Sequence, residues 1–252
     1  MTDSNPTSFG ALLDCLESIR KTCMDVSSPL SYEDNNLQAV YMSSMYSIVL
    51  ELADDAYQAL KARKELVSHV LTRALLEAVV DLCNVVKNPD YVNIRFQRAL
   101  VERRKKLIYL TQKEPELILE AGRSTEYVQS AVDKIDKLLD RDIRQPSIRQ
   151  RFKDADMEDY YDTVYSLLCD YAHHDTSAIV NRHIGLDVRL LSDKSLLMLS
   201  DLISNLLLKA TIAVHDFLHS DRIDTLKELQ SKWKVAYRLQ AVSIPPVNTP
   251  HH

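Results

Sequence analysis

Apolar residues recur every three or four positions along most of this chain, which is the spacing of one face of an α-helix. Glycine and proline are scarce between the breaks, and the breaks fall where the pattern stops, as at Asn88-Pro89. The pattern predicts helices over residues 8–24, 37–64, 66–87, 91–113, 124–140, 157–172, 193–219 and 221–239. We therefore predict an all-α fold, a multi-helix bundle with additional helices around it.

The stretch over residues 66–86, LVSHVLTRALLEAVVDLCNVV, is apolar on nearly every side of its helix. A helix of that kind belongs in the interior of a protein. Arg73 and Glu77 lie one turn apart within it, and an isolated buried ion costs several kcal/mol or more. The sequence therefore predicts a buried polar centre inside a helical core.

The bundle is expected to centre on residues 66–87, 157–172 and 193–219. No internal repeat or clear domain boundary is visible, so we predict a single helical domain over residues 1–240. The closing residues 241–252, with three prolines and two terminal histidines, are expected to form a disordered tail.

Composition excludes several classes of protein. Three glycines in 252 residues offer almost no positive-φ positions for hairpins and cannot build a glycine-rich phosphate loop. A net charge of −5 gives no overall attraction for nucleic acid or for an acidic membrane surface. The amino terminus lacks the regions of a signal peptide, and no apolar run reaches the length of a membrane span, so a cytoplasmic location is expected. We expect no cofactor and no membrane partner.

Metal ligation is disfavoured at both places where residue types suggest it. The four cysteines form no CxxC pair, which favours reduced thiols over a zinc or redox site. His215 and His219 approximate H-E-x-x-H, but aspartate replaces the glutamate and no third ligand follows. Histidines in the last turn of a helix are explained by its dipole, and we predict no metal site.

Two stripes of side chains at four-residue spacing are the candidate site. His69, Arg73 and Glu77 share one helical stripe, where Arg73 would bind an anion or position a group for proton transfer. The alternative is a structural ion pair to a neighbouring helix. The second stripe, with the two polar residues that follow it, consists of Tyr165, Cys169, His173, His174 and Asp175. A capping role at the helix C-terminus is the alternative for its histidines.

These two motifs resemble a prokaryotic all-helical family of unknown function that is distantly similar to HEPN domains. The family pattern is an R-x3-E helix followed by a Y-x3-S-x3-H helix, and Cys169 stands where serine is usual. The resemblance extends over roughly residues 38–218 and implies that the bundle has a HEPN-like core. It implies that Arg73, Glu77 and His173 meet across two packed helices, with Tyr165, His69, His174 and Asp175 around the ligand.

Two functions follow from these residues, and the sequence leaves open whether the protein is an enzyme. The first is an intracellular binding or regulatory module whose Arg73-Glu77-His173 centre holds an anionic ligand or fixes a conformation. The alternative is a HEPN-like, metal-independent ribonuclease effector of a defence or toxin–antitoxin system, which would have RNA as its partner. There His173 or His69 would be the base and Arg73 or Arg63 would stabilise the phosphate. The general tendency of soluble proteins favours a homodimer.

Overall fold

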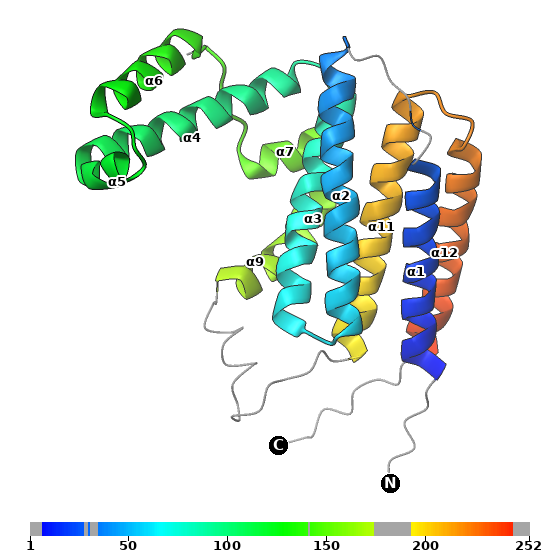
Figure 1. The fold of residues 1–252 in the computed structure, drawn as a ribbon. Coiled ribbons are helices and arrows are strands. Elements are labelled where there is room, and N and C mark those ends of the chain that lie inside the picture. Colours follow the sequence, from blue (N-terminus) through cyan, green and yellow to red (C-terminus); the bar gives the residue numbers. More distant parts are fainter. Residues whose placement is uncertain (1–6, 28–29, 31–34, 141, 174–192, 244–252) are drawn as a thin grey trace, which may run out of the picture. The chain divides into compact units, whose positions relative to one another are not determined.

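The structure is a computed structural model, and it describes residues 7–27, 30, 35–140, 142–173 and 193–243 (Figure 1). Helices account for almost all of these residues, and no strand occurs among them. The elements are α1 (Thr7–Ser27), α2 (Leu37–Lys61), α3 (Glu65–Lys87), α4 (Tyr91–Lys113), α5 (Pro115–Glu120), α6 (Thr125–Leu138), α7 (Ile148–Asp154), α8 (Glu158–Tyr160), a π-helix (Tyr161–Tyr165), α9 (Ser166–His173), α11 (Asp193–Phe217) and α12 (Ile223–Ser243). The predicted all-α, multi-helix fold is confirmed; a HEPN-like core stays a prediction.

Contacts divide the chain into two compact units: residues 1–87 with 151–252, and residues 88–150. The sequence predicts a single domain over residues 1–240. A division into compact units does not test that prediction, which stays a prediction. The last helix continues to Ser243, three residues into the expected tail, because its pattern does not stop at residue 240. The remaining tail residues, 244–252, lie outside the described part of the chain.

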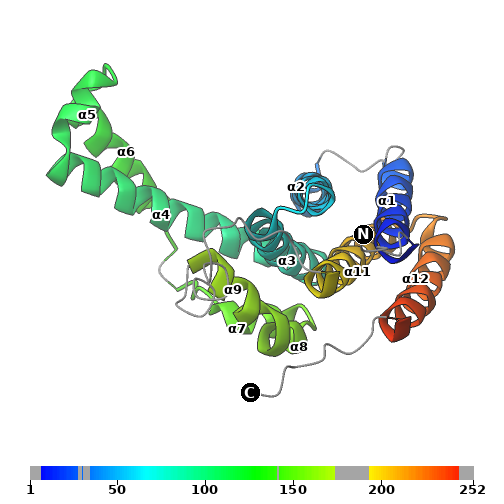
Figure 2. The same ribbon diagram turned by 90° about the horizontal axis from the view of Figure 1, so that it is seen from below.

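In the first unit, α11 is the central helix and packs against α1, α2, α3 and α12 (Figures 1 and 2). Its run of leucine and isoleucine is buried on several sides, with Leu199, Ile203 and Leu206 fully inaccessible. Among the described helices, one stretch, Lys194–Phe217, is long and apolar enough to cross a membrane. Because 67% of an apolar 18-residue window within it is buried inside the protein, it has the character of a core helix, and the membrane indication is weak.

Helix α3 lies between α2 and α11 and also contacts α9. Its second half is interior, and every residue from Ala78 to Val85 is buried. On α2, the buried positions include Ala39, Met42, Tyr46 and Val49. Leu37 and Ile48 of the same helix are 69% and 44% exposed, so α2 has apolar residues on two faces.

Three helix ends use a left-handed residue that is not glycine. Arg63, Asp156 and His219 have φ values of 52°, 53° and 51° after α2, α7 and α11. Glycine is the usual residue at such positions because it lacks the Cβ that makes this conformation strained. This chain has only three glycines, and residues with a Cβ occupy these three positions instead. The backbone at these helix ends is therefore strained.

The second unit is built from α4, α5 and α6, with α6 packed along α4. Val128, Val132 and Ile135 form the buried stripe of α6. Arg104 on α4 donates to the carboxylate of Asp136 on α6 from Nε at 2.6 Å and from Nη2 at 3.2 Å. Ser124 caps α6 by accepting the amide of Tyr127, as expected for a serine before a helix.

Candidate functional site

Arg73, Glu77 and Tyr165 form a closed triangle of polar contacts between α3 and the π-helix. Arg73 Nε donates to Glu77 Oε1 at 3.1 Å, and the Tyr165 hydroxyl donates to the same oxygen at 3.0 Å. Arg73 Nη2 lies 3.4 Å from the Tyr165 hydroxyl, and the guanidinium carbon lies 5.5 Å from the centre of the Tyr165 ring. Residues 92 positions apart in sequence are thus brought together.

The triangle is half-buried rather than sealed. The side chains of Arg73 and Glu77 are 20% and 32% exposed, so the expectation that both lie in a dry interior is wrong. The reason is local, because the stripe that carries them faces the π-helix and α9, which cover only part of it. Burial raises the pKa of Tyr165 to about 12, so its hydroxyl keeps its proton at neutral pH and acts as a donor to the carboxylate.

A π-helix carries Tyr165 into this position. Residues 161–165 form one π-helical turn in the segment expected to be a continuous α-helix over residues 157–172. The rings of Tyr161 and Tyr165 stack with centroids 5.5 Å apart, and Phe152 lies against both. Single π-helical turns inside α-helices often occur at functional sites, since they re-aim a side chain within an otherwise regular helix.

His69 lies one turn before Arg73 on the same stripe, but its side chain is fully buried. Its ring stacks on Tyr171 of α9, with centroids 3.7 Å apart, and Nδ1 lies 2.8 Å from the carbonyl of Glu65. This geometry gives His69 a packing role, and its predicted contact with a ligand stays a prediction. His173 is the last residue of α9. Its side chain, together with His174 and Asp175, lies outside the described residues.

A second ion pair on α3 was not expected from the sequence. Arg151 of α7 donates to Asp81 Oδ1 from Nε at 2.9 Å and from Nη2 at 2.5 Å. Both side chains are almost completely buried, and Asn84 donates to the Arg151 carbonyl at 2.9 Å. Asp81 lies four residues after Glu77 and so falls on the same helical stripe as Arg73 and Glu77. The four-residue spacing could therefore have identified Asp81 as a third charged residue of this stripe.

The two histidines at the end of α11 do not converge. His215 is fully buried, and neither ring nitrogen has a hydrogen-bond partner among the described residues. Burial lowers its pKa, which keeps the ring neutral. His219 is exposed and follows the helix in a left-handed conformation. Within the described part of the chain, no group of three metal-ligating side chains is found.

A groove in the first unit has a cavity volume of about 240 Å³. It lies between α3, α11 and α12, and Lys209 of α11 lines it together with Cys83 and Lys87 of α3. Lys87 bonds to the Asp156 carboxylate, which lowers the pKa of that carboxyl group, and burial raises the pKa of the Cys83 thiol. Charges of both signs line this groove, so it shows no preference for an anion.

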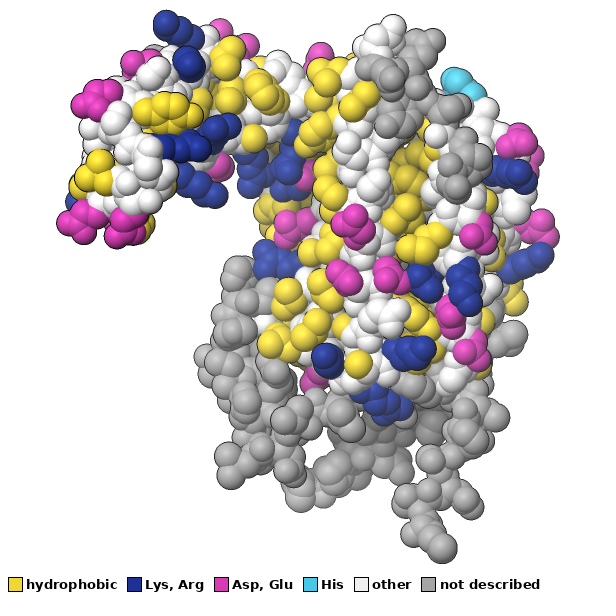
Figure 3. All heavy atoms as spheres, in the orientation of Figure 1, with side chains coloured by type: hydrophobic (Ala, Val, Ile, Leu, Met, Phe, Trp, Pro, Cys, Tyr) yellow, Lys and Arg dark blue, Asp and Glu magenta, His cyan; other side chains and the backbone are white. Residues whose placement is uncertain are grey.

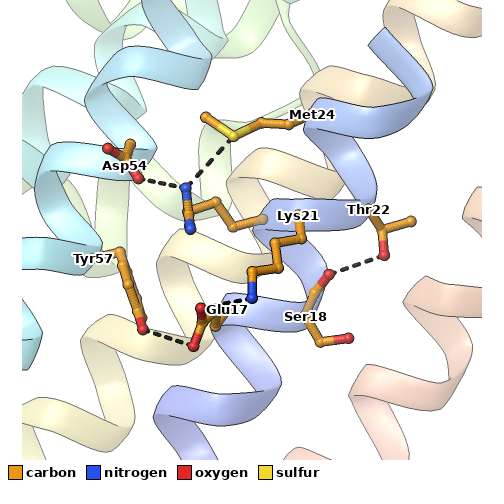
Figure 4. A network of polar contacts seen from close by, with 8 residues as sticks. Glu17, Ser18, Lys21, Thr22, Met24, Asp54 and Tyr57 are labelled. Atoms are coloured by element: carbon orange, nitrogen blue, oxygen red, sulfur yellow. Dashed lines mark hydrogen bonds and ion pairs between the residues drawn. The ribbon is translucent and has the colours of Figure 1, made fainter. Parts of the chain in front are cut away.

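A separate polar network joins α1 to α2 (Figure 4). Arg20 contacts Asp54 at 2.5 Å and lies 5.2 Å from the centre of the Tyr57 ring. The Tyr57 hydroxyl donates to Glu17, which also pairs with Lys21 (Figure 4). Each of these charged groups has an opposite charge beside it, so the network holds two helices together.

A sequence model of one protein family matches residues 39–189, more than half of the chain. The chain belongs to DUF5677, a family of unknown function. The DUF5677 match contains all but the first two residues of α2, together with α3, the second unit and the π-helix, and therefore all three residues of the triangle. The predicted membership in an uncharacterised helical family is confirmed. The relation to HEPN domains is not shown by the DUF5677 match. No curated protein and no solved structure matches the chain.

Proposed function

We propose that this protein is a binding or regulatory module of prokaryotic type whose Arg73-Glu77-Tyr165 centre binds an anionic ligand. One observation carries the proposal: a guanidinium, a carboxylate and a phenol meet at a π-helical turn where water reaches them. A cytoplasmic location and a homodimer stay predictions within it.

A comparison of the two arginine–carboxylate pairs on α3 supports a binding role for the first. Arg151 makes two short bonds to Asp81 out of contact with solvent, which is the arrangement of a structural pair. Among the contacts of Arg73, the one to the Tyr165 hydroxyl is 3.4 Å long, near the upper limit for a hydrogen bond, and the one to Glu77 is 3.1 Å long. A phosphate or carboxylate accepts more strongly from a guanidinium than a phenol does, so it can replace the longer contact.

Catalysis of RNA cleavage has less support in the geometry. His69 is buried beneath Tyr171, where no substrate reaches it, and Arg63 lies in the turn after α2. The remaining candidate base, His173, has its side chain outside the described residues. Cleavage of RNA is therefore an outcome that the experiment must distinguish from binding.

The test is thermal unfolding of the full chain with added sodium phosphate or sodium chloride at equal ionic strength. Phosphate stabilises proteins in general, so the quantity of interest is the difference between wild type and Arg73→Ala. We expect phosphate to raise the Tm more in wild type than in the variant, because a ligand stabilises the state that binds it. Arg222→Ala, which removes an exposed arginine of the same unit, is the matched control and should respond as wild type does.

An equal phosphate response in wild type and Arg73→Ala, with a lower Tm of the variant without phosphate, would make the triangle structural and end the proposal. The same proteins are incubated with mixed RNA. Cleavage by wild type that is lost in folded Arg73→Ala would establish the ribonuclease function in place of the binding module.

A further inference from the structure

Helix α4 is strongly basic in a protein that is acidic overall. Its 23 residues contain seven lysines and arginines and one acidic residue, Glu102. Residues 88–150, the whole second unit, contain 13 basic and 10 acidic residues, a charge of +3. The rest of the chain therefore has a charge of −8, since the total is −5. The second unit therefore has a net positive charge, whereas the rest of the molecule has a net negative charge.

Contacts within the unit match only part of this charge. Arg104 is held by Asp136, and Lys105 binds Glu102 at 3.0 Å, which also accounts for the one acidic residue of the helix. Four further cations of α4 are exposed and have no ion pair or hydrogen bond to the described residues: Arg98, Arg103, Lys106 and Lys113. A basic run on an exposed helix is commonly a solvated face, so the arrangement of these four decides what they can do.

The four cations share one face of α4. Arg98, Glu102, Lys106, Tyr109 and Lys113 follow one another at steps of three or four residues, and Arg103 lies beside Lys106 one step away. This face, defined by Arg98, Arg103, Lys106 and Lys113, is called the basic face below. It extends over about 22 Å, at a rise of about 1.5 Å per residue. In Figure 3, lysine and arginine side chains gather along the edge of this unit that α4 forms.

Two exposed aromatic rings accompany the basic face. Phe96 is 52% exposed and lies seven residues, or about two turns, before Arg103. Tyr109 is 55% exposed and lies between Lys106 and Lys113. The Tyr109 hydroxyl donates to Glu114 at 3.2 Å, which fixes the ring at the surface. Aromatic rings exposed beside cations present flat surfaces on which the bases of a single strand can stack.

We infer that the basic face of α4 binds single-stranded nucleic acid, with the four cations on the phosphates and Phe96 and Tyr109 stacked on bases. In chain order, the four cations are separated by rises of about 7.5, 4.5 and 10.5 Å along the helix, so their long side chains can reach phosphates along one strand. The two exposed aromatic rings beside them offer stacking platforms. An acidic protein partner would use the cations but would leave the two rings without flat partners, so nucleic acid is the better fit. The inference concerns the second unit and does not rest on the Arg73 centre.

The experiment measures the binding of a fluorescein-labelled 20-nucleotide single-stranded RNA to the full chain by anisotropy over a series of salt concentrations. Neutralising four phosphates predicts a slope of log affinity against log salt near −3, at about 0.7 per phosphate for single strands. Arg103→Glu with Lys106→Glu should weaken binding at least tenfold and reduce the slope to about −1.4, because two of the four contacts are lost. Phe96→Ala and Tyr109→Leu should each weaken binding about fivefold or more and leave the slope unchanged.

The matched control is Lys134→Glu with Lys137→Glu, which makes the same change in charge at exposed positions of α6 in the same unit. Its affinity should stay within about threefold of wild type, because these lysines lie outside the basic face. An equal loss in the control would show that net charge alone attracts RNA and would overturn the inference. So would the absence of measurable binding, or equally tight binding of poly-glutamate of similar charge, which would indicate an acidic protein partner.

Discussion

Tyr165 joins the π-helix to α3 through a single hydroxyl group. Tyr165→Phe removes the bond to Glu77 and the longer contact with Arg73, while the ring contacts with Phe152 and Tyr161 remain. We expect a loss of about 1 kcal/mol in the free energy of unfolding at pH 8, the usual value for one hydrogen bond. Urea unfolding measures it. Tyr41→Phe, on α2 of the same unit, is the control and should change the free energy little.

The same residue predicts a dependence of stability on alkaline pH. The pKa of Tyr165 is raised to about 12 in the folded protein, against about 10 in an unfolded chain. Between these values the unfolded chain releases the proton that the folded protein still holds, so stability is full below pH 10 and falls as the pH approaches 12. Tyr165→Phe should lose less stability than wild type between pH 9.5 and pH 11 in urea unfolding. Parallel losses in the two proteins would contradict this assignment.

His219 ends α11 with a left-handed backbone that suits glycine. Its φ is 51°, its side chain is exposed, and the amide of the next residue, Ser220, closes the helix on the His215 carbonyl at 2.9 Å. His219→Gly should stabilise the protein by about 1 kcal/mol, because the strain of a Cβ in this conformation is removed. Differential scanning calorimetry of His219→Gly and His219→Ala tests this. A Tm for His219→Gly no higher than that of His219→Ala would show that the strain is negligible.

At the scale of helices, the Asp81–Arg151 ion pair connects α7 to α3. Either Asp81→Leu or Arg151→Met leaves an unpaired charge in the interior and should cost about 3–5 kcal/mol. The double variant should recover most of this loss, since two apolar side chains pack where two charges were. The free energies of unfolding of the four proteins in urea give the coupling. Additive losses would mean that the two residues act separately.

The sequence predicted the long helices well and the short ones poorly. The bounds of α4 agree with the prediction, because Asn88-Pro89 precedes it and Pro115 follows it. Helix α5, with six residues, and α7, with seven, are too short to show a periodic pattern, and neither was predicted. The π-helix was also missed, since one wider turn does not alter the identity of the apolar residues around it.

The candidate site could be predicted where both partners lie on strongly periodic helices. Four-residue spacing singled out Arg73, Glu77 and Tyr165 as candidates, and the structure brings these three together. The predicted meeting of Arg73 and Glu77 with His173 stays a prediction. The same spacing also contains Asp81, but the partner Arg151 lies in α7, which is too short to show a periodic pattern. The expected dry interior failed for a different reason. Periodicity shows which residues share a face, whereas the exposure of that face depends on how much of it the neighbouring helix covers.

At the scale of the whole molecule, residues 88–150 are inserted into the first unit between the end of α3 and Arg151 within α7. The two points of insertion lie next to each other within that unit. Asn84 donates to the Arg151 carbonyl at 2.9 Å, and Lys87 donates to the Asp154 carbonyl at 3.2 Å. Because the chain leaves and re-enters the first unit at neighbouring positions, a short connection can replace the second unit without separating these contacts.

We therefore expect that replacing residues 88–150 by a short Gly-Ser linker leaves the first unit folded. Circular dichroism should show a helical protein with one cooperative unfolding transition, since the core around α11 draws none of its residues from the removed segment. The shortened protein should keep the phosphate response that depends on Arg73 and lose RNA binding, because the basic face is gone and the remaining charge is −8. Retained RNA binding would place the nucleic-acid surface on the first unit. Loss of cooperative unfolding would instead show that the first unit needs the second in order to fold.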